Sequence, residues 1–187
     1  MTKLIYVHGW GGNPTSEPWT NYLRSECEKK GVEFIAPEMP DTQRPVIEKW
    51  IAKLKEVADG KIGEDTYLVG HSIGCQTIMR YLEKASDDLI VKGIVFVAPW
   101  ISLVGLEEEE GSKEIAKPWL ETPIDFEKVK GKINELLAIF STDDPYVPLS
   151  NMKLFERKLD AEIVVKNNEG HFNETESINE IMEFVEK

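Results

Sequence analysis

A pentapeptide at residues 70–74, Gly-His-Ser-Ile-Gly, places a serine between an apolar strand pattern and a helical pattern. The preceding residues 66–69 read Thr-Tyr-Leu-Val, and residues 75–84 have the apolar spacing of a helix. A sharp turn from strand to helix strains the backbone at the serine, so small residues must flank it, as Gly70 and Gly74 do. The motif therefore predicts that Ser72 is exposed on a nucleophile elbow, at a helix N-terminus that favours negative charge.

Short apolar segments alternate with longer amphipathic ones along the chain. The segments with strand character are residues 4–7, 33–36, 66–69, 93–98, 136–141 and 162–166. The segments with helical spacing are residues 17–30, 45–58, 74–84, 150–158 and 176–186. This alternation is typical of a mostly parallel sheet covered by helices on both faces, so the sequence predicts an α/β fold.

The domain organisation follows from the length and from one long connection. A chain of 187 residues without repeats or linkers is expected to form a single domain, residues 1–187. Residues 99–135 are too long for an ordinary connection, and they hold an acidic run at 107–110 and a short helical pattern at 125–132. We interpret this excursion as a small lid followed by a crossover helix. The alternative is a solvated surface insertion.

The charge and the ends of the chain exclude several classes of function. The formal net charge is −12 and the isoelectric point is near 4.8. No basic stripe offsets this charge, so nucleic-acid binding is not expected. The N-terminal apolar run is too short for a signal peptide or a membrane span, which predicts a cytoplasmic protein that does not enter a membrane. Cys27 and Cys75 lack the spacing of a metal site or redox pair, so we expect packing roles and no metal.

A serine nucleophile needs a base, and one histidine has the right position for it. The chain has three histidines, and only His171 follows both the elbow and a late strand. Doubly wound hydrolases carry their residues in the order Ser, Asp or Glu, His, at the carboxyl ends of strands. We therefore predict that His171 is the general base, the alternative being an ordinary surface-loop histidine. His8 and His71 are expected to shape or support the site.

Two adjacent aspartates compete for the role of the acid that orients the base. Asp143 and Asp144 both follow the strand at 136–141. Successive side chains near a strand end point in different directions, so at most one can face His171. We favour Asp144, because Pro145 fixes the turn after it. Asp143 is the alternative and is otherwise expected to cap the turn.

The oxyanion donors and the pocket are expected at neighbouring loops. The N–H of Ile73 and the N–H of Trp10, in the loop after the first strand, are the predicted oxyanion donors. The loop 9–12 lacks the spacing of a dinucleotide fingerprint, so no nucleotide is expected. Aromatic residues expected around the centre could form an apolar acyl pocket or simply fill the core; they are Trp10, Trp100, Trp119, Tyr146 and Phe172.

These residues together give the chain a resemblance to a known family. It resembles the small single-domain serine hydrolases of the α/β-hydrolase fold, the family that includes retinoblastoma-binding protein 9. The similarity spans nearly the whole chain and rests on residues 8–9, 13–19, 37–41, 70–74, 141–148 and 170–172. It implies a three-layer fold with a reduced sheet of about six strands, without a large cap domain. It also implies Ser72, Asp144 and His171 as nucleophile, acid and base.

The sequence thus predicts a serine hydrolase that cleaves a carboxylic ester or a similar acyl bond through an acyl-enzyme. The expected partner is a small-molecule acyl substrate, and no cofactor is required. Peptidase and thioesterase activities remain open, since they use the same three residues. A protein-binding module on a hydrolase scaffold is a further alternative, although no protein partner is indicated and an intact triad argues against it.

Overall fold

The protein, represented by a computed structural model, is described at residues 1–58, 60–106 and 111–187. Its centre is a sheet of six strands in the order β2-β1-β3-β4-β5-β6, in which every neighbouring pair is parallel. The strands are β1 (Lys3–Val7), β2 (Glu33–Ile35), β3 (Thr66–His71), β4 (Val91–Val97), β5 (Ile133–Ser141) and β6 (Glu162–Lys166). The predicted α/β fold and the number of strands are confirmed.

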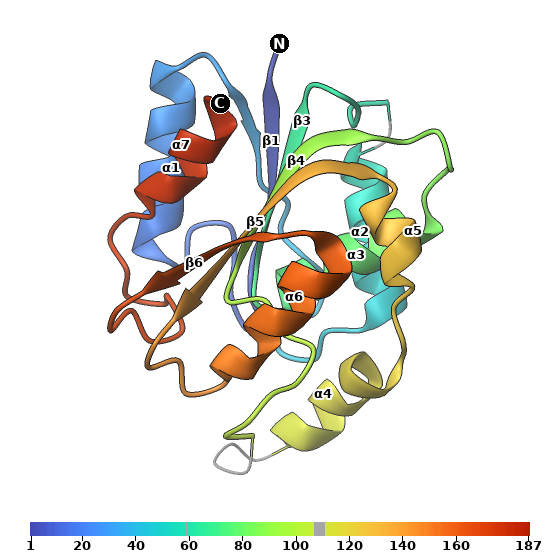
Figure 1. The fold of residues 1–187 in the computed structure, drawn as a ribbon, viewed down its shortest axis with the longest axis vertical. Helices are drawn as coiled ribbons and strands as arrows, with labels where there is room; N and C mark the ends of the chain where they lie inside the picture. Colours follow the sequence, from blue (N-terminus) through green and yellow to red (C-terminus); the bar gives the residue numbers. More distant parts are fainter. Residues whose placement is uncertain (59, 107–110) are drawn as a thin grey trace.

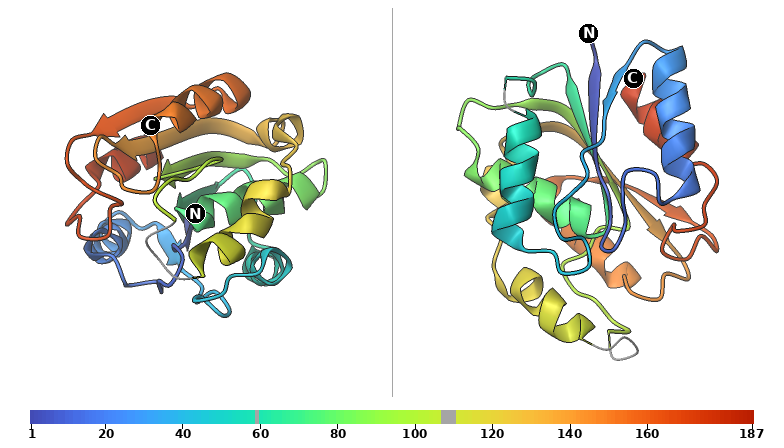
Figure 2. Two further views of the ribbon diagram at one scale, coloured as in Figure 1. Left: turned by 90° about the horizontal axis from the view of Figure 1, so that it is seen from below. Right: turned by 180° about the vertical axis from the view of Figure 1, so that it is seen from behind.

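Helices cover both faces of this sheet and make three layers (Figures 1 and 2). One face carries α1 (Pro18–Lys29) and α7 (Asn179–Val185). The other face carries α2 (Ile47–Ala58), α3 (Ile73–Lys84), α5 (Phe126–Lys130) and α6 (Met152–Leu159), which a 3₁₀ turn η1 (Leu149–Asn151) precedes. No helix within the described ranges is long and apolar enough to cross a membrane.

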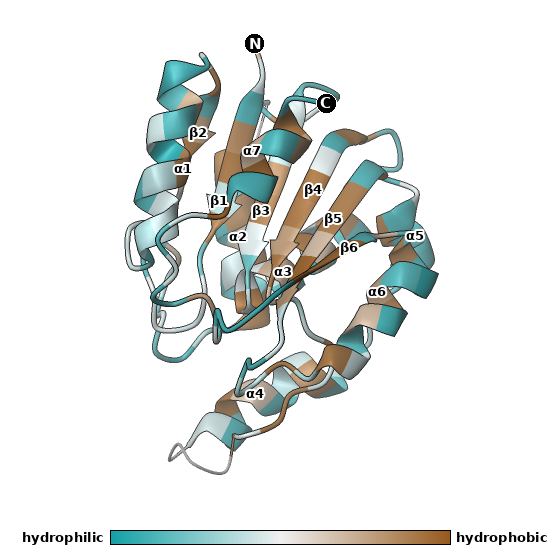
Figure 3. Cartoon of the chain, turned by 60° about the vertical axis from the view of Figure 1, so that its left-hand side comes forward, coloured by the Kyte–Doolittle hydropathy of each residue, from teal (hydrophilic) through white to brown (hydrophobic). Residues whose placement is uncertain are grey.

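The core lies between the sheet and its two helical layers. Every residue of β3 is buried, whereas the edge strands β2 and β6 contain no buried residue. A strand buried on both faces needs apolar side chains on both, which is why the central strands read as continuous apolar runs. Figure 3 shows these apolar strands inside helices whose outer faces are polar.

The order of the strands determines where a site can form. β2 lies on one side of β1 and β3 on the other, so the chain changes direction between the loops that follow β1 and β3. Such a switch point leaves a crevice at the carboxyl ends of the strands. The loop after β1, residues 8–12, and the turn after β3, which contains Ser72, flank this crevice.

The connection between β4 and β5 differs from the expectation. It forms α5, the expected crossover helix, but also α4 (Ser112–Glu121), which the sequence analysis did not predict because Pro118 is a helix breaker. Trp119 on α4 is buried, and its carbonyl accepts a hydrogen bond from Arg80 Nη2 at 2.8 Å, which fastens α4 to α3. Within the described part of residues 99–135 no large cap domain is present. The acidic run at 107–110, part of the predicted lid, lies outside the described residues.

Candidate active site

Ser72 occupies the turn between β3 and α3 in a strained backbone conformation. Its φ is 53° and its ψ is −116°, which few non-glycine residues adopt. The N–H of Ser72 donates to the carbonyl of Val97 at 2.9 Å, and the N–H of Cys75 donates to the carbonyl of Ser72 at 3.0 Å. The first bond holds the turn to β4, and the second holds it to the first turn of α3. The serine is therefore presented at the N-terminus of α3, as the sequence led us to expect.

His171 and Asp144 lie beside this turn and contact each other. His171 Nδ1 is 2.8 Å from Asp144 Oδ2, and the Asp144 side chain is 1% exposed. Asp144 Oδ1 accepts from the N–H groups of Tyr146 and Val147 at 2.9 and 3.0 Å, so the carboxylate is held in one orientation. Because a carboxylate only accepts, Nδ1 of His171 carries the proton and Nε2 is left with a lone pair.

Burial determines the protonation state of this histidine. It lowers the pKa of His171, although the hydrogen bond to Asp144 favours the charged form and opposes the shift. The imidazole is thus neutral at neutral pH. A neutral ring that is oriented by a carboxylate has the state required of a general base.

Asp143 has a different set of partners. Its Oδ1 accepts from Ser141 Oγ at 2.7 Å and from the N–H of Gly170 at 2.9 Å. Of the two candidate aspartates, Asp144 contacts the imidazole and Asp143 ties down the loop before it. The hydrogen bond from Ser141, aided by the one from Gly170, lowers the pKa of Asp143.

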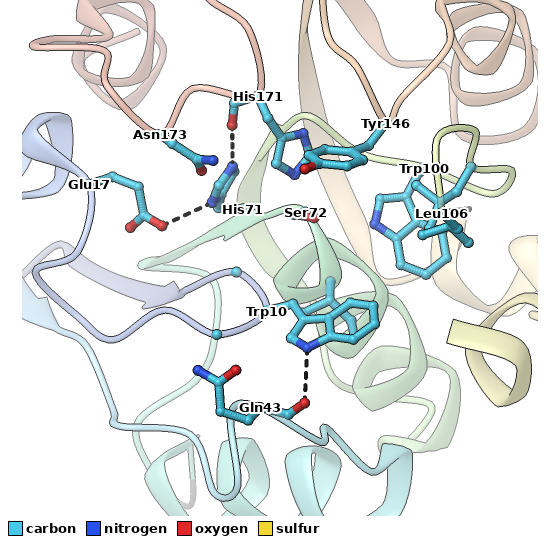
Figure 4. Close-up of a pocket in the computed structure, with 14 residues that line it drawn as sticks. Trp10, Glu17, Gln43, His71, Ser72, Trp100, Leu106, Tyr146, His171 and Asn173 are labelled. Carbon is cyan, nitrogen blue, oxygen red and sulfur yellow. Dashed lines mark hydrogen bonds and ion pairs between the residues drawn. The ribbon is translucent and has the colours of Figure 1, made fainter. Parts of the chain in front are cut away.

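Ser72 and His171 line one cavity of about 250 Å³ (Figure 4). Four further residues of the predicted site line it as well: Trp10, Ile73, Trp100 and Tyr146. The sequence analysis did not single out the rest of the lining for this pocket: Gly9, Gly11, Glu17, Gln43, His71, Leu103, Leu106 and Asn173. Most of these are on loops, where the sequence pattern carries no information about direction.

The cavity has two chemically different sides. Trp100 and Leu106 lie on one side of Ser72, and Glu17, His71 and Asn173 lie on the other (Figure 4). The first side suits an apolar group, and the second side suits polar contacts. The arrangement can therefore accept a molecule with an apolar part and a polar part on either side of Ser72.

Two of the expected pocket residues are elsewhere, which corrects that part of the prediction. Trp119 is 1% exposed, packs edge-on against Trp50 and donates from Nε1 to the carbonyl of Pro45 at 3.0 Å. Phe172 is completely buried, and its carbonyl accepts from Trp19 Nε1 at 3.1 Å. Neither residue lines the cavity. Both rings fill the core, the alternative that was open for every aromatic residue.

The predicted oxyanion donors follow two neighbouring strands and line the same cavity. Ile73 is the first residue of α3, and Trp10 follows β1. The neighbouring N–H groups of Gly11 and Gly12 donate to the carbonyls of Thr42 and Gly9 at 2.9 and 3.3 Å, so they are already engaged. The Trp10 indole donates to the carbonyl of Gln43 at 3.1 Å. This bond connects the loop after β1 to the segment that contains Gln43.

The other two histidines are buried, and His71 also lines the cavity. His8 Nε2 accepts from the N–H of Met39 at 3.1 Å, and Nδ1 donates to the carbonyl of Gly9 at 2.9 Å. Burial lowers the pKa of His8, so it joins two loops as a neutral ring.

His71 Nε2 lies 2.9 Å from the carbonyl of His171, and Nδ1 faces Glu17 Oε1 at 3.4 Å. Its position next to Ser72 was the one sequence signal that could have pointed to this pair. Among the described residues, no cluster of three or more His, Cys, Asp or Glu could hold a metal ion.

Comparison with known proteins agrees with the fold and the family expectation. A family model described as Serine hydrolase matches residues 4–184. Serine hydrolase RBBP9 of Rattus norvegicus is 30% identical over 179 residues, covering 94% of this chain and 89% of that protein. Among solved structures, the ydeN gene product from B. subtilis has a TM-score of 0.88 at 25% identity and covers 100% of this chain and 97% of that chain. Est1E from Butyrivibrio proteoclasticus has a TM-score of 0.74 at 19% identity over 98% of this chain and 85% of that chain, which shows a shared fold alone.

Proposed function

The chain belongs to the serine hydrolase family, and from this premise we propose that it cleaves a carboxylic ester or a similar acyl bond through an acyl-enzyme on Ser72. The observation that carries the proposal is the 2.8 Å contact between His171 and Asp144 beside the cavity that Ser72 lines. The strained conformation of Ser72 supports it, because such strain is characteristic of a nucleophile elbow.

In the proposed reaction, Ser72 Oγ attacks the acyl carbonyl carbon while His171 Nε2 takes its proton. Asp144 holds the imidazole through Nδ1–H and stabilises its cation. The N–H groups of Ile73 and Trp10 donate to the oxyanion of the tetrahedral intermediate. His171 then returns the proton to the leaving alcohol. Water repeats the sequence on the acyl-enzyme and releases the carboxylic acid.

The cavity suggests which acyl groups fit. Its volume of about 250 Å³ is slightly below the range of roughly 300–1,000 Å³ that is usual for small-molecule sites. The side that Trp100, Leu106 and Tyr146 contribute to is apolar enough for the hydrocarbon part of an acyl chain. We therefore propose a small-molecule substrate with a short or medium acyl group.

The experiment is labelling with a fluorophosphonate probe, followed by turnover of p-nitrophenyl esters of increasing chain length. Ser72→Ala should abolish both. Ser25→Ala removes an exposed serine of α1 and is the matched control, which should leave both unchanged. Labelling of wild type and Ser72→Ala to the same extent contradicts the nucleophile assignment.

The same panel separates ester cleavage from its alternatives. A thioester and an anilide of the same acyl group are assayed beside the ester. Faster turnover of the thioester or the anilide replaces the esterase proposal with a thioesterase or a peptidase that uses the same residues. Absence of labelling and of turnover favours the protein-binding alternative.

A further inference from the structure

On the polar side of Ser72, a buried glutamate at the N-cap of α1 and a buried histidine at the end of β3 connect the start of α1 to the loop that carries His171. His71 is 1% exposed and Glu17 is 5% exposed. Resting on the function proposed above, we infer that Glu17 is a positioning residue: through His71 it holds the backbone of His171 and so fixes the place of the general base.

The first link is the bond between His71 and His171. The carbonyl of His171 can only accept, so Nε2 of His71 carries a proton and donates it across 2.9 Å. The two rings also pack against each other, with centroids 5.1 Å apart and planes tilted by 44°. His71 therefore contacts both the backbone and the ring of the proposed base.

The second link is the contact between His71 and Glu17. Nδ1 of His71 lies 3.4 Å from Oε1 of the Glu17 carboxylate. The buried Nδ1 atom has no hydrogen-bond partner of good geometry in the described part of the chain, so Glu17 is the group that faces it. The Glu17 carboxylate therefore lies against the Nδ1 edge of the ring, while Nε2 on the other edge holds the carbonyl of His171.

The surroundings of Glu17 favour its charged form. Tyr6 Oη donates to Oε2 at 3.2 Å. Burial alone would raise the pKa of Glu17, but the contacts with His71, aided by the bond from Tyr6, outweigh burial and lower that pKa. The carboxylate thus keeps its charge and orients the imidazole of His71, much as Asp144 orients that of His171.

The loop around His171 needs such anchors. Gly170 and Phe172 have positive φ values of 52° and 63°, and the second is unfavourable for a bulky side chain. Three consecutive residues are held from three elements: the N–H of Gly170 by Asp143, the carbonyl of His171 by His71, and the carbonyl of Phe172 by the Trp19 indole. The bond from His71 is the one made to the proposed base itself.

The test compares Glu17→Gln, which keeps the shape and removes the charge, with Glu28→Gln, an exposed control on α1, the helix that Glu17 precedes. For Glu17→Gln we expect kcat on the best ester to fall about 10- to 100-fold, the scale on which misplacing a catalytic group costs rate, with KM nearly unchanged. Glu28→Gln should match wild type. Urea unfolding of each variant separates this effect from loss of fold. An unchanged kcat, or a change confined to KM, overturns the inference.

A second measurement does not depend on turnover. The chain has three histidines, so ¹⁵N-histidine NMR resolves each ring, and it is recorded on Ser72→Ala protein with and without Glu17→Gln. We expect a proton on Nε2 of His71 in both proteins and a shift of the His71 Nδ1 signal when Glu17 is replaced. An Nδ1 signal that does not change contradicts the contact between the two residues. If Ser72→Ala labels and turns over esters like wild type while the His71 signal depends on Glu17, the proposed function fails and the contact between Glu17 and His71 stands.

Discussion

Gly74 lies so close to the end of β1 that a Cβ atom built on it would be 2.1 Å from the carbonyl oxygen of Val7. This oxygen belongs to the backbone of a central strand and cannot move aside. The N-terminus of α3 can approach β1 only because residue 74 has no side chain. The position of Ser72 over the crevice therefore depends on this contact.

We expect Gly74→Ala to lower the free energy of unfolding by about 3 kcal/mol or more, at or above the upper end of ordinary overpacking, because a backbone atom is the obstacle. Urea-induced unfolding followed by tryptophan fluorescence measures it. Gly63→Ala is the control, since a Cβ there meets no atom within 4 Å. Equal midpoints for the two variants would contradict the steric explanation.

The sequence was informative wherever a local pattern has one physical solution. The glycines at 70 and 74 flank a turn that must be tight, and the aspartate and the histidine that each follow a late strand lie in contact with each other. Alternation of strand and helix patterns was enough to predict the sheet. The tight turn and the strand and helix patterns each lie within a few residues of the feature that they predict.

The remaining features depend on contacts between distant segments. Trp119 and Trp100 look alike in the sequence, yet the first packs on Trp50 and the second lines the cavity. Glu17 reads as the start of a helix, and nothing local shows that it faces His71, which is 54 residues later by the numbering (71 − 17). Tertiary packing decides both cases.

The different partners of Asp144 and Asp143 lead to different effects on activity. Asp144→Asn should lower kcat by about 10⁴-fold, because an amide that donates to Nδ1 leaves the imidazole in the wrong tautomer. Asp143→Ala removes the acceptor for Ser141 and Gly170 and leaves the imidazole contact in place, so a loss of about 10-fold is expected, equivalent to about 1.4 kcal/mol. Steady-state ester hydrolysis measures both. A larger loss for Asp143→Ala would reverse the two roles.

The environment of His171 predicts the pH dependence of the reaction. Burial lowers its pKa below the ordinary histidine value of about 6.5, and the base must be neutral to act. The value of kcat/KM should therefore stay high as the pH drops to about 6.5 and fall only below it, as His171 takes up a proton. The profile of kcat/KM against pH measures this, and an acid limb at or above that value contradicts it.

Stability must be recorded in the same buffers. An unfolded histidine with the higher pKa binds more protons than the folded one, so acid also weakens the fold in this window. Circular dichroism at each pH shows whether the loss of activity precedes unfolding. The prediction requires that it does.

Leu106 offers a way to change the substrate preference without touching the reacting groups. It lines the apolar side of the cavity, whereas Val104 in the same loop is 49% exposed and does not line it. Leu106→Phe should lower the ratio of kcat/KM for a hexanoyl ester over an acetyl ester by about 10-fold or more, the scale of one or two methylene groups in a hydrophobic pocket. Val104→Phe adds the same ring to the same loop and should leave the ratio unchanged. Equal shifts in the two variants, or none in Leu106→Phe, would mean that the acyl chain does not occupy this side of the cavity.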